Sequence, residues 1–273
     1  MQFSPATRLT AVIGDPVTQS LSPLLHNKVY ENEGIDAVML AFGNPSIEKL
    51  VAAMRALPIH LAAVTMPHKQ TIMPFLDEIE AEARAIGAVN TVINSGGKLI
   101  GYNTDVVGIA AALEGAALKG VNALLIGAGG AARTAAYLLK REGANIFCRN
   151  RERAQAEDLL RTFGGTFVEE DALGSVAFDV IINATPVGMK PNVDASPFPE
   201  ELIRPVSTIF DLVYSPLETK LLASAARRGA RAVSGLTMFL AQGLEQERLW
   251  LVKTMENEPY RELLEARVRE RDH

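Results

Sequence analysis

A glycine-rich turn follows an apolar run and opens an alanine-rich segment. The run at residues 121–126 is typical of a buried parallel strand, and the chain continues Gly127-Ala128-Gly129-Gly130-Ala131-Ala132. In this G-x-G-x-x-A pattern Gly127 permits a tight turn, Gly129 allows close backbone approach to a pyrophosphate, and Ala132 lets helix pack on strand. The helix N-terminus offers unpaired N–H groups to phosphates. The pattern predicts a dinucleotide site, the alternative being a plain strand-to-helix turn that needs glycine.

The next strand, residues 144–148, indicates which dinucleotide is bound. An NAD site usually ends this strand with an acidic residue that binds the ribose hydroxyls. Here the chain reads Cys148-Arg149-Asn150-Arg151-Glu152 instead. Asn150 and Arg151 can bind a 2′-phosphate, which favours NADP over NAD, although Glu152 is an unfavourable neighbour for a phosphate. The alternative is a basic helix start on the surface.

Composition excludes several classes of protein. The chain has 273 residues, 48% of them apolar, and a net charge of −5 with both signs mixed along it. The length suffices for two modest domains, and the charge gives no support to a nucleic-acid or polybasic membrane role. A single cysteine, Cys148, excludes an intrachain disulfide and a cysteine-rich metal cluster, and we expect no metal centre. Without a signal-like N-terminus or a membrane-length apolar run, we expect a soluble cytoplasmic protein.

Hydrophobic patterning predicts an α/β protein with two domains. Strands are expected at residues 9–14, 37–42 and 61–65, with a hairpin around Ser95-Gly96-Gly97. Helices are expected from near Pro23, at 47–56, from the turn after 65 through about Gly87, and at 106–118. A Rossmann-type doubly wound parallel sheet would use strands 121–126, 144–148, 178–183, 208–213 and 230–233. We assign residues 1–104 plus 237–273 to a substrate-binding domain and 105–236 to a dinucleotide domain, with a C-terminal helix packing back on the first.

Several polar residues lie beside these expected elements. Ser20 and Ser22 precede a helix that has proline near its start, so they are either capping residues or donors to a carboxylate. Thr65 and Lys69 follow a strand at its carboxyl end, where open α/β sheets place ligands, although a lone lysine there is usually solvated. Asp105 precedes a helix and is either its cap or a functional carboxylate.

Nine short motifs occur in order along nearly the whole chain: "SLSPLLHN", "VTMPHK", "GAVNTV", "GYNTD", "GAGGAAR", "NR", "INATPVGM", "DLVYSPLETKLL" and "GLTM…Q". Together they resemble the shikimate dehydrogenases and their quinate-using relatives. The resemblance implies an N-terminal α/β domain that binds a cyclic hydroxy acid, a Rossmann domain that binds NADP or, in some relatives, NAD, and a cleft between them. The implied reaction is the reversible NADPH-linked reduction of 3-dehydroshikimate to shikimate, in the chorismate pathway of aromatic amino acid biosynthesis. The implied assembly is a monomer or a homodimer.

The resemblance also assigns roles to residues. Lys69 and Asp105 would meet in the cleft as the catalytic pair, with Lys69 as the base and Asp105 orienting the lysine and the hydroxyl. The substrate would contact Ser20, Ser22, Thr65, Asn90, Tyr214 and Gln242, the two serines taking its carboxylate. The cofactor would contact Gly127, Gly129, Gly130, Ala131, Ala132, Asn150, Arg151, Thr185, Leu212, Gly235 and Met238.

The sequence also departs from the family pattern. Relatives commonly have Asn at the position of Ala63 and often His at that of Gln19, and Glu152 and Gln155 replace Thr and Arg of the usual 2′-phosphate clamp. Trp250 lacks the Thr-Gly that often follows it. Ala63 leaves quinate or aminoshikimate open as substrate, and the altered clamp leaves NAD open. A non-catalytic dinucleotide-sensing regulatory protein is a further alternative, against which the retained catalytic pair argues.

Overall fold

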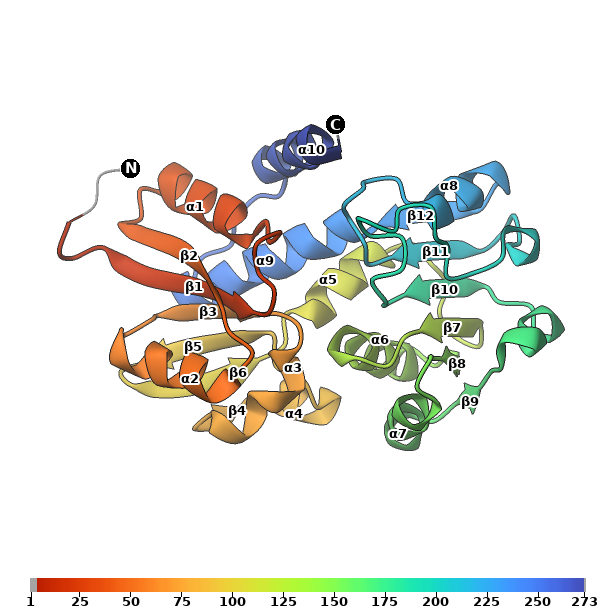
Figure 1. The fold of residues 1–273 in the computed structure, drawn as a ribbon, viewed down its shortest axis with the longest axis horizontal. Helices are drawn as coiled ribbons and strands as arrows, with labels where there is room; N and C mark the ends of the chain where they lie inside the picture. The colour runs from red at the N-terminus through yellow and green to blue at the C-terminus, as the bar shows by residue number, and fades with distance from the viewer. Residues whose placement is uncertain (1–3, 273) are drawn as a thin grey trace. The chain divides into compact units, whose positions relative to one another are not determined.

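The computed structural model describes residues 4–272, which form two compact units. Unit 1 comprises the chain up to Thr104 together with Leu240–Leu264, and unit 2 comprises Asp105–Phe239 with the chain from Glu265 onward. Each unit combines one sheet with helices, which confirms the predicted two-domain α/β class (Figure 1). The assignment of substrate to one domain and cofactor to the other stays a prediction.

Unit 1 contains a six-stranded mixed sheet in the order β2-β1-β3-β5-β6-β4. Its strands are β1 Arg8–Gly14, β2 Ala37–Gly43, β3 Leu61–Val64, β4 Glu78–Ile79, β5 Thr91–Ser95 and β6 Lys98–Tyr102. The first three are parallel, whereas β5 and β6 form the predicted hairpin around Gly96 and Gly97. Because β5 runs antiparallel to β3, with Thr91 opposite Ala63, the start of β5 lies at the edge where β3 ends. The end of β6 returns to that same edge, since Tyr102 lies opposite Thr91.

The helices of unit 1 confirm two predictions and correct a third. They are α1 Ser22–Glu33, α2 Ile47–Ala56, α3 His68–Thr71, η1 Met73–Phe75 and α4 Ala81–Ile86. The helices from near Pro23 and at 47–56 were predicted, but the continuous helix through Gly87 was wrong. Pro74, within η1, has no N–H to continue a helix, and the Asp77 carboxylate accepts the Leu99 N–H at 2.7 Å. That bond draws the acidic run into the short strand β4 beside β6.

Unit 2 contains a six-stranded, fully parallel sheet in the order β12-β11-β10-β7-β8-β9. Its strands are β7 Asn122–Ile126, β8 Asn145–Arg149, β9 Thr166–Phe167, β10 Val180–Asn183, β11 Thr208–Asp211 and β12 Arg231–Ser234. The chain builds outward from β7 to β9 and then returns to place β10 on the other side of β7. Strand order therefore reverses between β7 and β10, and ligands of open α/β sheets bind beyond the carboxyl ends of strands at such a point.

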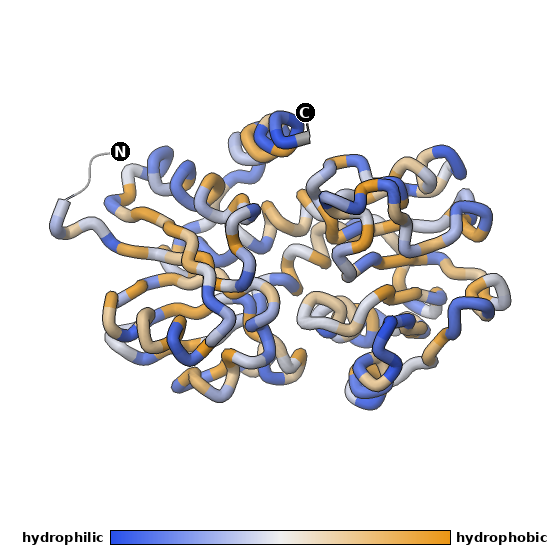
Figure 2. The backbone as a smooth tube through the Cα atoms, in the orientation of Figure 1, coloured by the Kyte–Doolittle hydropathy of each residue, from blue (hydrophilic) through white to orange (hydrophobic). Residues whose placement is uncertain are grey.

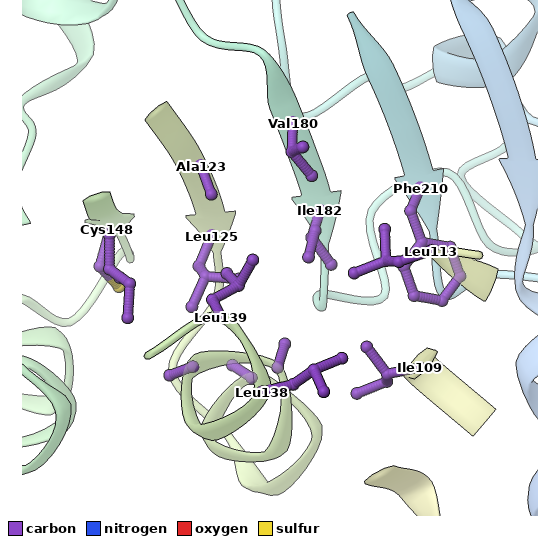
Figure 3. Close-up of a cluster of buried hydrophobic side chains, with 14 of the residues drawn as sticks. Ile109, Leu113, Ala123, Leu125, Leu138, Leu139, Cys148, Val180, Ile182 and Phe210 are labelled. Carbon is purple, nitrogen blue, oxygen red and sulfur yellow. The ribbon is translucent and has the colours of Figure 1, made fainter. Parts of the chain in front are cut away.

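The helical segments of unit 2 cover its sheet around an apolar core. They are α5 Asp105–Ala112, α6 Gly130–Arg141, α7 Arg153–Phe163, η2 Glu170–Ser175, η3 Glu200–Leu202 and α8 Lys220–Arg227. Figure 3 shows Leu125, Ile182 and Phe210 on three strands near the apolar side chains of α5 and α6. In Figure 2 the hydrophobic colour follows the central strands, whereas α7 is largely hydrophilic. The helix expected at 106–118 is shorter because the chain turns at Gly115, whose φ is +77°.

The terminal region folds as two helices, α9 Gly235–Leu251 and α10 Glu258–Asp272. The unit boundary falls within α9, so Gly235 belongs to unit 2 and Gln242 to unit 1. The boundary also divides α10, whose residues up to Leu264 belong to unit 1 and whose residues from Glu265 belong to unit 2, so the packing of the closing helix on the first domain stays a prediction. Within residues 4–272, no helix has both the length and the apolar character needed to cross a membrane.

Candidate active site

The amide of Asn90 is the centre of a buried polar cluster in unit 1. Its Oδ1 accepts hydrogen bonds from the Thr104 N–H at 2.7 Å and the Thr91 hydroxyl at 2.8 Å. Its Nδ2 donates to Thr104 Oγ1 at 2.9 Å and to Gln242 Oε1 at 3.2 Å. The start of β5, the end of β6 and α9 are thus joined by one side chain. The predicted residues Asn90 and Gln242 lie together.

Sequence reasoning missed three members of this cluster, Thr91, Thr104 and Gln246. Gln246 is fully buried, and its Nε2 donates to Thr91 Oγ1 at 3.0 Å and to the Asn90 carbonyl at 3.4 Å. The available signal was the spacing of Gln242 and Gln246, because residues four apart lie on one face of a helix. A polar pair on an otherwise apolar helix face requires buried partners.

The turn after β3 places Lys69 near the same cluster. The Thr65 N–H donates to the Ile13 carbonyl at 2.9 Å, and a Cβ on Gly14 would lie 2.3 Å from Thr65 Cγ2, so this turn packs tightly on the end of β1. The Lys69 carbonyl accepts the N–H of Val89, the residue before Asn90, at 2.7 Å. Thr65 and Lys69 are both half-buried. The structure therefore brings the Lys69 and Asn90 backbones together within unit 1.

The two serines differ in their local roles. Ser20 Oγ accepts the Ser22 N–H at 3.2 Å, as a capping residue would. Leu21 is at the N-cap position of α1 and makes no side-chain capping bond, and the buried Ser22 is the first residue of the helix. Helix capping is thus part of what Ser20 does. Binding of a carboxylate by the pair stays a prediction.

Asp105 is the first residue of α5 and is 2% exposed. It directly follows Thr104, whose N–H and hydroxyl are both held by Asn90. The backbone that enters Asp105 is therefore fixed by the unit 1 cluster. A carboxyl group buried to this degree is costly unless it is paired or hydrogen-bonded.

The glycine turn of unit 2 has the geometry that its motif predicts. Gly127 has φ +113°, and a Cβ there would lie 3.0 Å from the Ala184 carbonyl oxygen, so any other residue is strained and crowded. Gly129 is the N-cap of α6 at φ −76°, and a Cβ there would meet no atom within 4 Å. Ala132 is fully buried, while Gly130 and Ala131 are half-buried in the first turn. The first N–H groups of α6 therefore adjoin open space at Gly129, which fits a pyrophosphate.

A second buried network, missed by sequence reasoning, holds the ends of β10 and β11. Asn183 Nδ2 donates to Asp211 Oδ1 at 2.9 Å, and Asn183 Oδ1 accepts the Thr185 hydroxyl at 2.6 Å. Asp211 also accepts the Thr219 hydroxyl at 2.6 Å and the Val213 N–H at 3.0 Å. Burial raises the pKa of Asp211 to about 6, against the opposing effect of these hydrogen bonds. The network positions Thr185 beside the glycine turn, because a Cβ on Gly127 would lie 3.1 Å from Thr185 Cγ2.

The start of α9 packs on the end of β11. A Cβ on Gly235 would lie 2.2 Å from the Leu212 carbonyl oxygen, so only glycine fits. Met238 is buried one turn later, and the rings of Tyr214 and Phe239 are 5.1 Å apart. Burial raises the pKa of Tyr214, which keeps its hydroxyl protonated at neutral pH. Leu212, Tyr214, Gly235 and Met238 are thus grouped within unit 2.

Asn150 and Arg151 follow β8 but face different surroundings. Asn150 Nδ2 donates to the Glu152 carbonyl at 2.9 Å and to Gln155 Oε1 at 3.2 Å, so Gln155 orients the amide. The Arg151 side chain is 93% exposed, with its Nε 3.5 Å from Glu152 Oε1. An exposed ion pair of this length contributes little, so the guanidinium can change partners at low cost.

Comparison with known proteins decides the family. The model of the shikimate dehydrogenase substrate-binding domain matches residues 12–92, and that of shikimate/quinate 5-dehydrogenase matches 109–197. The NADP⁺ shikimate dehydrogenase of Moorella thermoacetica is 40% identical over 265 residues, covering 92% of this chain and 90% of the relative. This chain belongs to the shikimate dehydrogenase family.

Solved structures of the family have the same fold. The shikimate dehydrogenase of Aquifex aeolicus superposes with a TM-score of 0.89 at 37% identity, covering 96% of this chain and 98% of the other. That of Thermus thermophilus, in complex with NADP(H) and shikimate, gives 0.87 at 35% identity, with 96% and 99% coverage. The resemblance inferred from the nine motifs is confirmed.

Substitutions at Gly127 and Gly129 should distinguish an effect on stability from an effect on dinucleotide binding. We expect Gly127→Ala to destabilise the protein by about 1–3 kcal/mol, because it forces a side chain into a left-handed, crowded position. Gly129→Ala has an allowed φ and open space, so its melting temperature should stay that of the wild type. Its methyl group would obstruct a pyrophosphate, and its NADP⁺ dissociation constant should rise about tenfold or more. Calorimetry and dinucleotide titration measure both, and wild-type NADP⁺ affinity in Gly129→Ala would contradict the assignment.

Asp211 predicts a pH-dependent contribution to stability. Its folded-state pKa of about 6 exceeds the ordinary 3.8, so protonation favours the folded form. The contribution of Asp211 to the free energy of unfolding is therefore fully present below about pH 4 and is lost as the pH rises through 6. The size of this effect is about 3 kcal/mol. We expect the melting temperature of the wild type, relative to Asp211→Asn, to fall between pH 4 and pH 7. A difference that is constant over this range would contradict the assignment.

Proposed function

We propose that this chain catalyses the reversible NADP-linked hydride transfer between 3-dehydroshikimate and shikimate. The observation that carries the proposal is the buried cluster around Asn90, in a chain of this family. Within unit 1, that cluster joins Gln242 to the turn that carries Lys69. It gathers hydrogen-bonding groups suited to a polyhydroxylated ring, and its backbone is bonded to the turn that carries Lys69.

Each part of unit 1 has a distinct task in this reaction. Ser20 and Ser22 donate hydrogen bonds to the substrate carboxylate at the start of α1. Asn90, Thr65 and Gln242 hydrogen-bond the ring hydroxyls. The four hydrogen bonds of the Asn90 amide use both of its N–H donors and both lone pairs of its oxygen, so contact with the ring requires the exchange of one partner, such as Gln242 at 3.2 Å.

Proton transfer belongs to Lys69, and orientation belongs to Asp105. In the oxidative direction the Lys69 amine accepts the proton of the reacting hydroxyl, and Asp105 orients both the hydroxyl and the lysine. Tyr214, kept protonated by burial, lines the substrate site as a hydrogen-bond donor. When bound, NADP⁺ supplies the hydride acceptor that amino-acid side chains do not provide.

The cofactor assignment rests on the geometry of unit 2. The open space at Gly129 and the N–H groups of α6 suit the pyrophosphate, and Thr185, Leu212, Gly235 and Met238 would flank the nicotinamide. Asn150 and the exposed Arg151 would bind the 2′-phosphate. The absence of an acid at the tip of β8, which ends Cys148-Arg149, supports NADP over NAD.

We further propose a cytoplasmic enzyme that is a monomer or a homodimer. Sedimentation analysis of the purified chain distinguishes the two assembly states.

The decisive experiment compares initial rates on shikimate and quinate, each with NADP⁺ and NAD⁺. We expect shikimate with NADP⁺ to dominate. Lys69→Ala should lower kcat by about 10²–10⁴-fold while NADP⁺ still binds, because only the proton acceptor is lost. Lys49→Ala, which changes an exposed lysine of α2, is the matched control.

Four outcomes of this experiment would contradict the proposal. A preference for quinate would overturn the substrate assignment and make the buried Ala63 the residue to mutate next, and a preference for NAD⁺ would overturn the cofactor assignment. Slow turnover of all four pairs with tight dinucleotide binding would favour a regulatory protein. Normal turnover by Lys69→Ala would exclude that residue as the base.

Arg151 should discriminate between the two dinucleotides. We expect Arg151→Ala to raise the KM for NADP⁺ about tenfold and to leave that for NAD⁺ unchanged, because only NADP⁺ carries the 2′-phosphate. Arg161→Ala removes an equally charged, 73% exposed side chain at the far end of α7 and should change neither constant. Equal effects of Arg151→Ala on both dinucleotides would show that Arg151 does not bind the 2′-phosphate.

A further inference from the structure

A second cluster of buried polar side chains in unit 1 joins α1, α9 and β1 but takes no part in the chemistry proposed above. It consists of Thr10, His26, Tyr30 and Glu247, all of which are fully buried. We call these four residues the Glu247 junction. None of the four belongs to the residues predicted to bind substrate or cofactor.

The hydrogen bonds of the junction converge on one carboxylate oxygen. Tyr30 donates its hydroxyl to Glu247 Oε1 at 2.8 Å, and His26 Nδ1 is hydrogen-bonded to the same oxygen. The Thr10 hydroxyl lies 2.9 Å from the Tyr30 hydroxyl and also donates to the Val38 carbonyl at 3.2 Å. Burial, together with the Glu247 carboxylate, raises the pKa of Tyr30 well above its usual value, so the phenol remains a donor.

The junction lies where α1 and α9 pack tightly on each other. A Cβ on Gly243 would lie 2.5 Å from Leu25 Cδ2 and 3.8 Å from His26 Nε2, so the backbone of α9 rests on side chains of α1. Gln242 directly precedes Gly243. Ser22 is one helical turn before His26, on the same face of α1. One proposed substrate contact therefore lies a turn from the junction on α1, and the other is next to the glycine at which α9 packs on α1.

Joining two helices through buried polar side chains costs free energy of desolvation. His26 Nε2 and Glu247 Oε2 find no hydrogen-bond partner among residues 4–272, and apolar side chains of similar size often stabilise a buried interface more. Apolar packing, however, tolerates sliding and rotation of helices, whereas two groups directed at one carboxylate oxygen favour a single arrangement. The hydrogen bonds of the Glu247 junction are thus better suited to fixing the positions of α1 and α9 than to stabilising the fold.

We propose that Glu247 is a positioning residue for the substrate: by binding His26 and Tyr30 together, it holds Ser22 and Gln242 where one ring acid can reach both. This inference rests on the proposed function of those two residues. It concerns unit 1 alone, so it predicts an effect on the ring acid and none on the dinucleotide.

The test measures kcat and the KM values for shikimate and NADP⁺ in purified variants. We expect Glu247→Leu to raise the KM for shikimate about ten- to hundredfold, because a misplacement of about 1 Å is enough to lose that much. Its kcat should stay within about threefold of the wild-type value, and its KM for NADP⁺ should be unchanged. Glu247→Gln keeps an oxygen that accepts from Tyr30 and from His26 Nδ1–H, so it should restore the KM for shikimate to within about threefold of wild type.

Two further variants keep the test decisive. Glu245→Leu changes a neighbouring carboxylate of α9, paired with Arg248, and should leave all constants unchanged. If Glu247→Leu does not fold, Tyr30→Phe decides instead, since it removes one donor and keeps the ring. We expect it to raise the KM for shikimate about three- to tenfold with an unchanged KM for NADP⁺.

The outcomes separate this inference from the proposed function. A wild-type protein that does not turn over shikimate refutes the proposed function. An active wild type whose folded Glu247→Leu variant keeps its KM for shikimate, or loses affinity for shikimate and NADP⁺ equally, overturns the positioning role. Failure of Glu247→Gln to restore the KM would also overturn it, because the acceptor geometry would then be irrelevant.

Discussion

The need to satisfy the buried amide of Asn90 is the constraint on which unit 1 depends most. An amide in this position must find donors and acceptors within the protein, since leaving one unpaired costs about 1–3 kcal/mol. Its partners come from β5, from the end of β6 and from α9, which lies about 150 residues later in the chain. One side chain therefore dictates where a hairpin ends and how the C-terminal region returns. The same bonds leave Thr104 fixed immediately before Asp105 and place the Lys69 turn beside the cluster.

In unit 2, too, hydrogen bonds between buried polar side chains hold the ends of strands. Its parallel strands bury both faces, and the polar groups at their carboxyl ends are satisfied by Asn183 and Asp211. Gly127 then closes the turn after β7 against the backbone of Ala184, where no side chain fits. These strand ends and the helix N-terminus support the proposed pyrophosphate site without a dedicated charged residue. This explains why small residues, rather than basic ones, dominate the turn.

One helix, α9, contributes to both units because its first turn and its remainder carry different residues. The first turn of α9 supplies Gly235 and Met238 to unit 2, while Gln242, Gln246 and Glu247 bond to residues of unit 1. The glutamines satisfy the cluster around Asn90, and Glu247 holds α1. A helix with so many buried polar groups is poorly suited to simple core packing. Its composition is understandable if α9 serves to position groups on its neighbours.

The sequence by itself determined the elements and the family, because hydrophobic period, glycine turns and motif order are local properties. It predicted α2 and the turn of the β5–β6 hairpin, and it placed the dinucleotide motif between a strand and a helix. It failed where a distant partner decides the outcome: the Leu99 N–H binds Asp77, and the chain enters β4 at the next residue instead of continuing a helix. Likewise, nothing local marks Asp211 or Glu247 as different from surface residues. Only the tertiary structure shows that they are buried, because burial and hydrogen-bond partners are set by segments far apart in the chain.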